Sequence, residues 1–193
     1  MFIEEYFGMV KVGLAKTCVT DGNGTEIDIQ KACEMIIDKA DAVKKEKGLI
    51  FFCGNGASAT MAEHMSHDWF QNAEINTTTV SETSHITAIS NDCSYDDVFS
   101  FRIKRILSER DILVTVSSSG NSPNIINAIK AARENGAYIV TFSGMKADNT
   151  SRRLGDLNFY VPLDAYGLVE SAHAVLLHGV LDMYLDRYMG GMH

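Results

Sequence analysis

Ile112-Leu-Val-Thr-Val-Ser-Ser-Ser-Gly-Asn-Ser-Pro123 is an apolar run that continues into a serine-rich loop, and the helical pattern 124–132 follows it. A strand that leads through such a loop into a helix leaves free backbone N–H groups at the helix start, where the positive end of the helix dipole lies. The serine hydroxyls add donors without bulk or charge. The loop has neither the lysine of a P-loop nor the glycine spacing of a dinucleotide site. It therefore favours a single phosphate on a small molecule, with a turn that only caps the helix as the alternative.

Two further polar segments follow apolar or helical patterns. Cys53-Gly-Asn-Gly-Ala-Ser58 lies between the apolar run 49–53 and the helical pattern 58–70. In open parallel sheets, ligands bind outside the carboxyl ends of the strands, so two such loops at one edge would form a polar crevice. In the third segment, Ser90–Asp96, the Asp92 carboxylate can bond a substrate hydroxyl or cap the helix that follows.

Apolar runs alternate with helical patterns from residue 48 onward, which predicts an α/β fold with a parallel sheet covered by helices on both faces. The predicted strands cover residues 49–53, 77–80, 112–116, 137–142 and 157–161. The predicted helices cover 58–70, 96–108, 122–135 and 167–188, and the segment 84–90 is ambiguous.

Two more helical patterns, 2–17 and 25–47, come first and are separated by the turn 21–24. We therefore expect one domain over 1–193, in which a helical hairpin, 1–47, precedes the core, 48–193. The final helical pattern is apolar on nearly every face, and such a helix has to be buried. The leading helices can cover part of it, and a second subunit can cover the rest, so we expect an oligomer.

The composition is that of a globular protein. The chain has 193 residues, of which 46% are hydrophobic, which is enough for one well-buried core. The net charge of −8 comes without a basic stripe, so nucleic acid is not an expected partner. No charge-free segment reaches the length that spans a membrane, and the N-terminus lacks a signal-peptide pattern. The four cysteines form no CxxC pair, which indicates reduced thiols and a cytoplasmic protein away from the membrane.

Ionisable side chains recur at helical spacing in two places. His64 and Asp68 are four residues apart and share a face of the helix that follows the glycine-containing loop. Glu170 and His178 are eight residues apart, about two turns, on the apolar final helix. Buried ionisable groups need partners, and bonds among Glu170, His173 and His178, or to a second subunit, would satisfy them without any catalytic role.

The chain resembles the sugar-isomerase (SIS) family, and more closely its phosphoheptose isomerases, in three segments: Gly54-Asn-Gly-Ala-Ser58, Ser90-Asn-Asp92 with Tyr95-Asp96, and Ser117-Ser-Ser-Gly-Asn-Ser122. The resemblance covers nearly the whole chain. It implies a SIS-type three-layer sandwich whose N-terminal helices pack in an oligomer, and a serine loop that grips a sugar phosphate. The substrate-binding residues that it implies are Asn55, Gly56, Ser58, Asp92, Ser117, Ser118, Ser119, Ser122 and Glu170.

The resemblance also implies one zinc ion per site and two catalytic residues. The implied ligands are His64, Asp68, Glu170 and His178, with Asp68 as base and His178 as acid. Both histidines match the family pattern, but Asp68 stands where the family has a glutamate and Glu170 where it has a glutamine. The family also has an aspartate at the position of Gly167 and an arginine at that of Asn72.

By this resemblance the protein is an aldose–ketose isomerase that converts sedoheptulose 7-phosphate to D-glycero-D-manno-heptose 7-phosphate for surface polysaccharide, in capsule or lipopolysaccharide. Its partners would be a small phosphorylated sugar and further copies of itself, in a homotetramer with sites between subunits. Two alternatives stay open. One is an isomerase or epimerase of another sugar phosphate, and the other is a non-catalytic SIS protein that binds a sugar phosphate or a protein partner.

Overall fold

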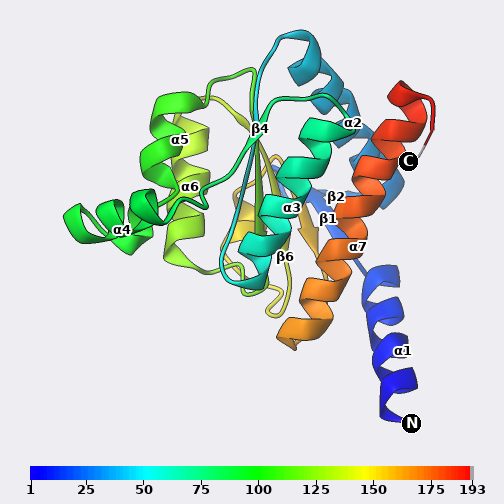
Figure 1. Ribbon diagram of the computed structural model, residues 1–193. Helices are drawn as coiled ribbons and strands as arrows, with labels where there is room; N and C mark the ends of the chain where they lie inside the picture. The colour runs from blue at the N-terminus through cyan, green and yellow to red at the C-terminus, as the bar shows by residue number, and fades with distance from the viewer. Residues whose placement is uncertain (192–193) are drawn as a thin grey trace.

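The computed structural model describes residues 1–191, and within that range seven strands form one sheet in the order β2-β1-β7-β6-β5-β3-β4 (Figure 1). Neighbouring strands from β4 to β7 are parallel, which confirms the predicted α/β fold. The predicted domain ends at residue 193, and its last two residues lie outside the described range. The strands are β1 Cys18–Asp21, β2 Glu26–Ile27, β3 Ile50–Gly54, β4 Thr77–Thr78, β5 Ile112–Ser117, β6 Tyr138–Ser143 and β7 Leu157–Tyr160.

Helices cover both faces of the sheet and make three layers (Figure 1). One face packs against α2, α3 and α7, and the other packs against α4, α5 and α6. The helices are α1 Phe2–Ala15, α2 Ile29–Lys45, α3 Ala57–Gln71, α4 Thr83–Asp92, α5 Ser100–Ile106, α6 Pro123–Glu134 and α7 Tyr166–Tyr184.

The central strands are apolar throughout because both of their faces are covered. In β3, Ile50 and Phe52 join the core under α2, α3 and α7, whereas Phe51 and Cys53 join the core on the opposite face. Side chains alternate between the two faces of a strand, so this short run supplies both cores. Complete burial raises the pKa of the Cys53 thiol, which is a core residue rather than a reactive one.

The segment between the first two helices differs from the prediction. Residues 18–27 form a hairpin of β1 and β2, and α2 begins at Ile29 rather than at residue 25. The Asp28 carboxylate caps α2 by accepting a hydrogen bond from the Lys31 N–H at 3.1 Å. Residues 1–47 are therefore two helices joined by a β-hairpin, not a helical hairpin. These strands are too short for an alternating pattern to show in the sequence.

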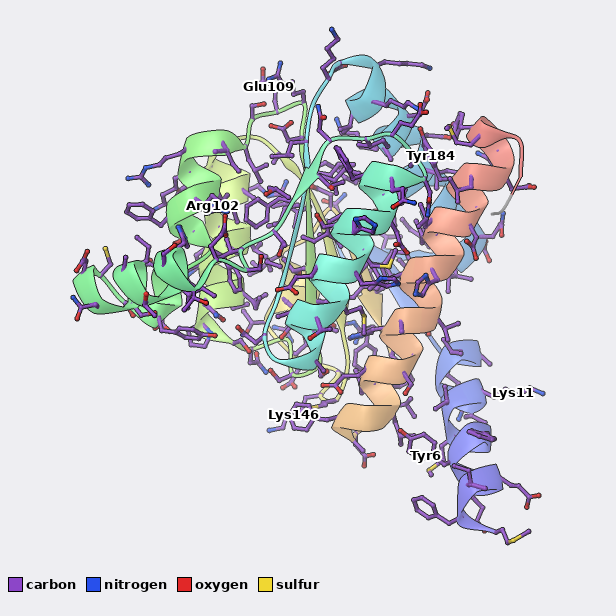
Figure 2. All side chains as sticks on the ribbon, viewed as in Figure 1. Tyr6, Lys11, Arg102, Glu109, Lys146 and Tyr184 are labelled. Atoms are coloured by element: carbon purple, nitrogen blue, oxygen red, sulfur yellow. The ribbon has the colours of Figure 1, made fainter. Side chains whose placement is uncertain are left out.

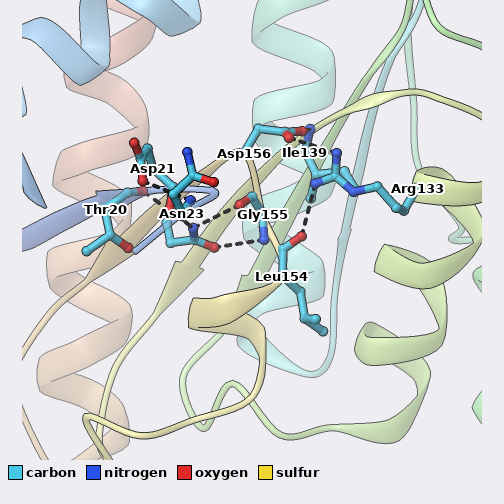
Figure 3. A network of polar contacts seen from close by, with 9 residues as sticks. Thr20, Asp21, Asn23, Arg133, Ile139, Leu154, Gly155 and Asp156 are labelled. Atoms are coloured by element: carbon cyan, nitrogen blue, oxygen red, sulfur yellow. Dashed lines mark hydrogen bonds and ion pairs between the residues drawn. The ribbon is translucent and has the colours of Figure 1, made fainter. Parts of the chain in front are cut away.

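The hairpin adds an antiparallel edge to the parallel sheet, because β1 pairs antiparallel with β7. The side-chain amide of Asn158 in β7 donates to the carbonyls of Thr20 and Asp21, each at 3.4 Å. The same side chain exchanges hydrogen bonds with the backbone of Gly155, which ties the hairpin to the turn before β7 (Figure 3). Since β7 begins at Leu157, this network holds the amino end of β7.

Three other boundaries differ from the prediction. The predicted helix 96–108 is a 3₁₀ turn, Tyr95–Asp97, followed by α5, and the ambiguous segment 84–90 is helical as α4. The predicted strand 77–80 pairs only at Thr77–Thr78. The last helix ends at Tyr184 and continues as one π-helical turn, Leu185–Met189.

Helix α1 extends away from the body of the molecule and contacts α7 (Figure 1). Five large apolar side chains of α1 are exposed: Phe2, Ile3, Phe7, Met9 and Val12. On α7, Val175 is 53% exposed, so neighbouring helices of one chain cover α7 only in part. Although α7 is long and rich in apolar residues, no helix within residues 1–191 has the length and apolarity needed to span a membrane.

Candidate functional site

The glycine loop, residues 54–58, and the serine loop, residues 117–122, lie side by side at the carboxyl edge of the sheet. Strands β3 and β5 are neighbours, and their register pairs Gly54 with Val116. Each loop leads directly into a helix, α3 after the glycine loop and α6 after the serine loop. The two polar loops thus share one edge, as their strand–loop–helix patterns predicted.

A cavity of about 160 Å³, which we call the serine pocket, lies between these loops and the start of α7. Its lining residues are Asn55, Ser58, Val116, Ser117, Ser118, Ser119, Ser122, Tyr166 and Glu170. Most of the predicted substrate-binding residues therefore come together. Gly56 and Asp92 do not belong to the lining, and Tyr166 is an addition that the sequence did not indicate.

The hydroxyl of Ser118 is the feature of this pocket that points to a ligand. Ser118 is 5% exposed, and its hydroxyl has no hydrogen-bond partner among residues 1–191. A buried polar group without a partner destabilises a fold unless a ligand or water satisfies it. By contrast, the Ser117 hydroxyl accepts from the Gly120 N–H at 3.2 Å, and the Ser119 hydroxyl accepts from the Asn121 N–H at 3.3 Å. Ser118 is therefore available to a molecule in the serine pocket.

Asn55 is held in place by two side chains for which the sequence predicted no such role. Asn55 and the buried Asn124 of α6 exchange two side-chain hydrogen bonds of 2.9 Å. The Tyr95 hydroxyl donates to the same Asn55 side-chain oxygen at 3.1 Å. Tyr95 belongs to the polar segment 90–96 and Asn124 is the second residue of α6, and neither segment predicts a partner for these side chains. The contacts that fix Asn55 join segments far apart in the sequence, so only the folded structure reveals them.

Gly56 and Asp92 have other positions. Gly56 has a φ of +56° where the chain turns into α3, and this left-handed conformation favours glycine. Asp92 is the exposed last residue of α4, and its carboxylate accepts a hydrogen bond from the neighbouring Asn91 side chain at 2.9 Å. Tyr95, rather than Asp92, connects this segment to the glycine loop.

Three ionisable side chains meet between α3 and α7: His64, Asp68 and His178, which we call the ionisable cluster. One potential ligand atom of each lies within 4.8 Å of the other two. His64 Nε2 is 3.3 Å from Asp68 Oδ2, and the His64 and His178 ring centroids are 5.2 Å apart. Further along the same two helices, Trp69 packs against Tyr184, which lies between α3 and α7 (Figure 2). The packing of these helices therefore positions the cluster.

Glu170 does not join the ionisable cluster. It precedes His178 by eight residues, and an α-helix rises 1.5 Å per residue, so the two backbone positions lie about 12 Å apart along α7. Glu170 lines the serine pocket instead. Within one chain, the predicted four-ligand set thus divides into three converging side chains and one distant carboxylate.

Two other residues of α7 have structural explanations. A Cβ atom at Gly167 would lie 2.9 Å from the Tyr6 hydroxyl oxygen, so a side chain at this position would have to displace the end of Tyr6 from α1. Figure 2 shows Tyr6 on the side of α1 near the start of α7. His173 is fully buried, with Nε2 3.1 Å from the Ser143 carbonyl oxygen, and burial lowers its pKa to about 4. His173 is therefore a neutral core residue outside the site.

Known proteins resemble this chain in both sequence and fold. Residues 16–144 match the SIS domain. The phosphoheptose isomerase of Shewanella denitrificans is 34% identical over 188 residues, which covers 89% of this chain and 93% of the relative. That of Solidesulfovibrio magneticus is 32% identical over 148 residues, which covers 74% of this chain and 71% of the relative.

Two solved structures of phosphoheptose isomerases resemble the fold. The one from Neisseria gonorrhoeae has a TM-score of 0.80 and 25% identity, and covers 95% of each chain. The one from Francisella tularensis has a TM-score of 0.78 and 20% identity, over 94% of this chain and 95% of the other. The three-layer sandwich is thus the fold of these structures, as the three sequence segments implied.

Proposed function

The chain belongs to the phosphoheptose isomerases of the SIS-domain family, and we propose that it is an aldose–ketose isomerase that converts sedoheptulose 7-phosphate to D-glycero-D-manno-heptose 7-phosphate. The product would serve the synthesis of surface polysaccharide, in capsule or lipopolysaccharide. The partner molecule is a small phosphorylated sugar.

The separation of the serine pocket from the ionisable cluster is the observation that carries this proposal. Glu170 lines the pocket and His178 belongs to the cluster, about 12 Å further along α7. In a heptulose 7-phosphate, the phosphate is on C7 and isomerisation takes place at C1 and C2, at the opposite end of the sugar. A phosphate pocket and a set of proton-transfer groups at separate positions along α7 suit a substrate that carries its phosphate and its reacting carbons at opposite ends.

The serine pocket is proposed to hold the phosphate. The unpaired Ser118 hydroxyl, the other serines of the loop and the N-terminus of α6 supply donors and a positive dipole end. Phosphate binding far from the reacting carbons provides binding energy that orients the other end of the sugar. Asn55, Ser58 and Glu170 line the same pocket and would contact the substrate.

The ionisable cluster is proposed to move the protons. The Asp68 carboxylate, as base, removes a proton from C1 of the ketose and returns it to C2 of the resulting enediolate. The His178 imidazole transfers a proton from O1 to O2, so that the carbonyl group moves from C2 to C1. His64, whose Nε2 is 3.3 Å from Asp68 Oδ2, orients the carboxylate. Atoms are neither gained nor lost, as isomerisation requires.

Zinc is the proposed cofactor, held by His64, Asp68 and His178. The ligand atoms of these residues converge to within 4.8 Å of one another, and two imidazoles with one carboxylate are a donor set of catalytic zinc sites that keep a fourth position open. When bound, the ion would act as a Lewis acid toward the carbonyl oxygen of the sugar. Glu170 would bind substrate rather than this ion, because it lines the serine pocket.

A homotetramer with sites between subunits is part of the proposal. The exposed apolar side chains of α1 and the exposed Val175 of α7 support burial of these helices against other copies. The cytoplasm is the proposed compartment, and the four cysteines, which are all free thiols, support it.

The proposal is tested by incubating the purified protein with sedoheptulose 7-phosphate and following the sugar by NMR. An aldose heptose 7-phosphate should form, a chelator should stop its formation, and added zinc should restore it. Unphosphorylated sedoheptulose is the matched control and should react far less efficiently. No turnover with or without zinc would refute the proposed activity, whereas turnover of a different sugar phosphate would favour the alternative isomerase.

A further inference from the structure

The segment 144–151, which we call the brace segment, follows β6 and is bonded to the serine loop. The Gly144 N–H donates to the Ser118 carbonyl at 3.1 Å, and the Ser151 N–H donates to the Gly120 carbonyl at 2.9 Å. Two carbonyl groups of the serine loop are therefore turned toward the brace segment.

These two hydrogen bonds fix the direction of two peptide groups. A trans peptide unit is planar, so the N–H of the next residue points opposite to the carbonyl, and no cis bond occurs within residues 1–191. The N–H groups of Ser119 and Asn121 consequently point away from the brace segment. Ser119 lines the serine pocket and no residue of the brace segment does, so these bonds leave the Ser119 N–H on the phosphate side. The Asn121 N–H donates to the Ser119 hydroxyl at 3.3 Å instead.

Asn149 is the centre of the brace segment. It is 1% exposed, and both atoms of its side-chain amide are used several times. The amide nitrogen donates to Ser143 Oγ at 3.2 Å and to the carbonyls of Gly144 at 3.3 Å and Lys146 at 2.9 Å, and the oxygen accepts from Ser151 Oγ at 3.2 Å and the Arg152 N–H at 3.1 Å. One side chain thus holds both ends of the segment that meets the serine loop.

Asn149 and its neighbour also touch the serine loop directly. Gly120 has a φ of +61°, and a side chain there would collide with the Asn149 amide oxygen, so the loop backbone rests against this amide. Thr150 adds an outer tie, because its N–H and its hydroxyl donate to the Asn121 side-chain oxygen at 2.9 and 2.8 Å. Movement of Asn149 would therefore be transmitted to the loop.

We propose that Asn149 is a positioning residue of the phosphate site: through the brace segment it orients the Ser119 peptide N–H of the serine loop toward the phosphate. This inference rests on the proposed function of the serine pocket as the phosphate site. It assigns a role to a residue that touches no substrate and lies 27 residues beyond the loop's last serine, Ser122.

The test is calorimetric titration of inorganic phosphate into the wild type and an Asn149→Ala variant. Because a misdirected Ser119 N–H loses a charge-assisted hydrogen bond, we expect phosphate affinity to fall about tenfold. If the enzyme is active, KM for the phosphorylated substrate should rise by a similar factor with kcat nearly unchanged. Asn158→Ala is the matched control, since Asn158 is also 1% exposed and hydrogen-bonded on both amide atoms, but none of its partners belongs to the serine loop or the brace segment.

Equal phosphate affinities for wild type and Asn149→Ala would overturn the inference, and so would an equal loss in Asn158→Ala. If Asn149→Ala does not fold, Thr150→Val decides, because it removes an exposed hydroxyl tie between the brace segment and Asn121. A fall in phosphate affinity of about threefold, as expected for one hydrogen bond, supports the proposed role of the brace segment. An unchanged phosphate affinity refutes it. Phosphate binding without turnover would refute the proposed isomerase but leave this inference standing.

Discussion

The serine pocket and the ionisable cluster lie along the same two helices but are built differently. The pocket uses backbone and hydroxyl groups at strand ends, and Ser58, Ser117 and Ser118 are 3%, 6% and 5% exposed. In the cluster, the His64 side chain is 53% exposed and that of Asp68 is 19% exposed. The pocket is fixed by the register of two neighbouring strands, whereas the cluster depends on helix packing and on side-chain length.

This difference teaches which part of the site can vary. The serine loop has every serine of the family pattern. The ionisable cluster, by contrast, has Asp68 in place of the family's glutamate. The donors of the serine pocket are backbone groups and short side chains at strand ends, so a substitution there has little room to preserve their positions. Side chains that project from helices can change length while the fold stays the same, so the chemistry can be altered without loss of phosphate binding.

The assignment of proton transfer to the ionisable cluster and of phosphate binding to the serine pocket would be wrong if turnover did not need the cluster. His178→Ala should lower kcat by a factor on the order of 1,000, because a general acid–base group contributes roughly 10²–10⁴. Titration with inorganic phosphate should give an unchanged affinity. His67→Ala, which removes an exposed histidine of α3 outside the cluster, should keep full activity. A His178→Ala enzyme with most of its turnover would remove the cluster from the mechanism.

The length of the Asp68 side chain provides a second test of the ionisable cluster. Asp68→Glu should lower kcat by about 10- to 100-fold, because Asp68 is already 3.3 Å from His64 and an extra methylene moves the carboxylate by roughly 1 Å. Steady-state kinetics at saturating substrate measure this effect. Glu63→Asp, an exposed change on the same helix, should have none. A rise in kcat would show that the family's glutamate fits this site better than the native aspartate.

The smallest of the three effects concerns the pocket. Ser118→Ala should raise KM for the phosphorylated sugar about tenfold, the value of one hydrogen bond to a charged group, and leave kcat nearly unchanged. Thr115→Val is a closely matched control, because Thr115 also has a buried hydroxyl without a partner among residues 1–191, on the strand β5 that leads into the serine loop but outside the pocket lining. Equal KM values for wild type and Ser118→Ala would place the phosphate elsewhere.

Local sequence predicted the pocket better than the cluster. The serine loop lies within one continuous strand–loop–helix pattern, so its residues stay together whatever the details of packing. Glu170 and His178 share a helix face, but the sequence could not tell that His64 and Asp68 of α3 converge with only one of them, His178. The bonds of Asn55 to Tyr95 and Asn124 join segments far apart in the chain, and short-range patterns carry no information on such contacts.

The two edge strands of the sheet affect how molecules of this protein can associate. Both edge strands, β2 and β4, are two residues long. Short edges offer few unpaired backbone groups to another chain. Strand addition, the usual route by which sheets grow into aggregates, is therefore disfavoured, and self-association is left to helix surfaces, where side chains decide which partner fits.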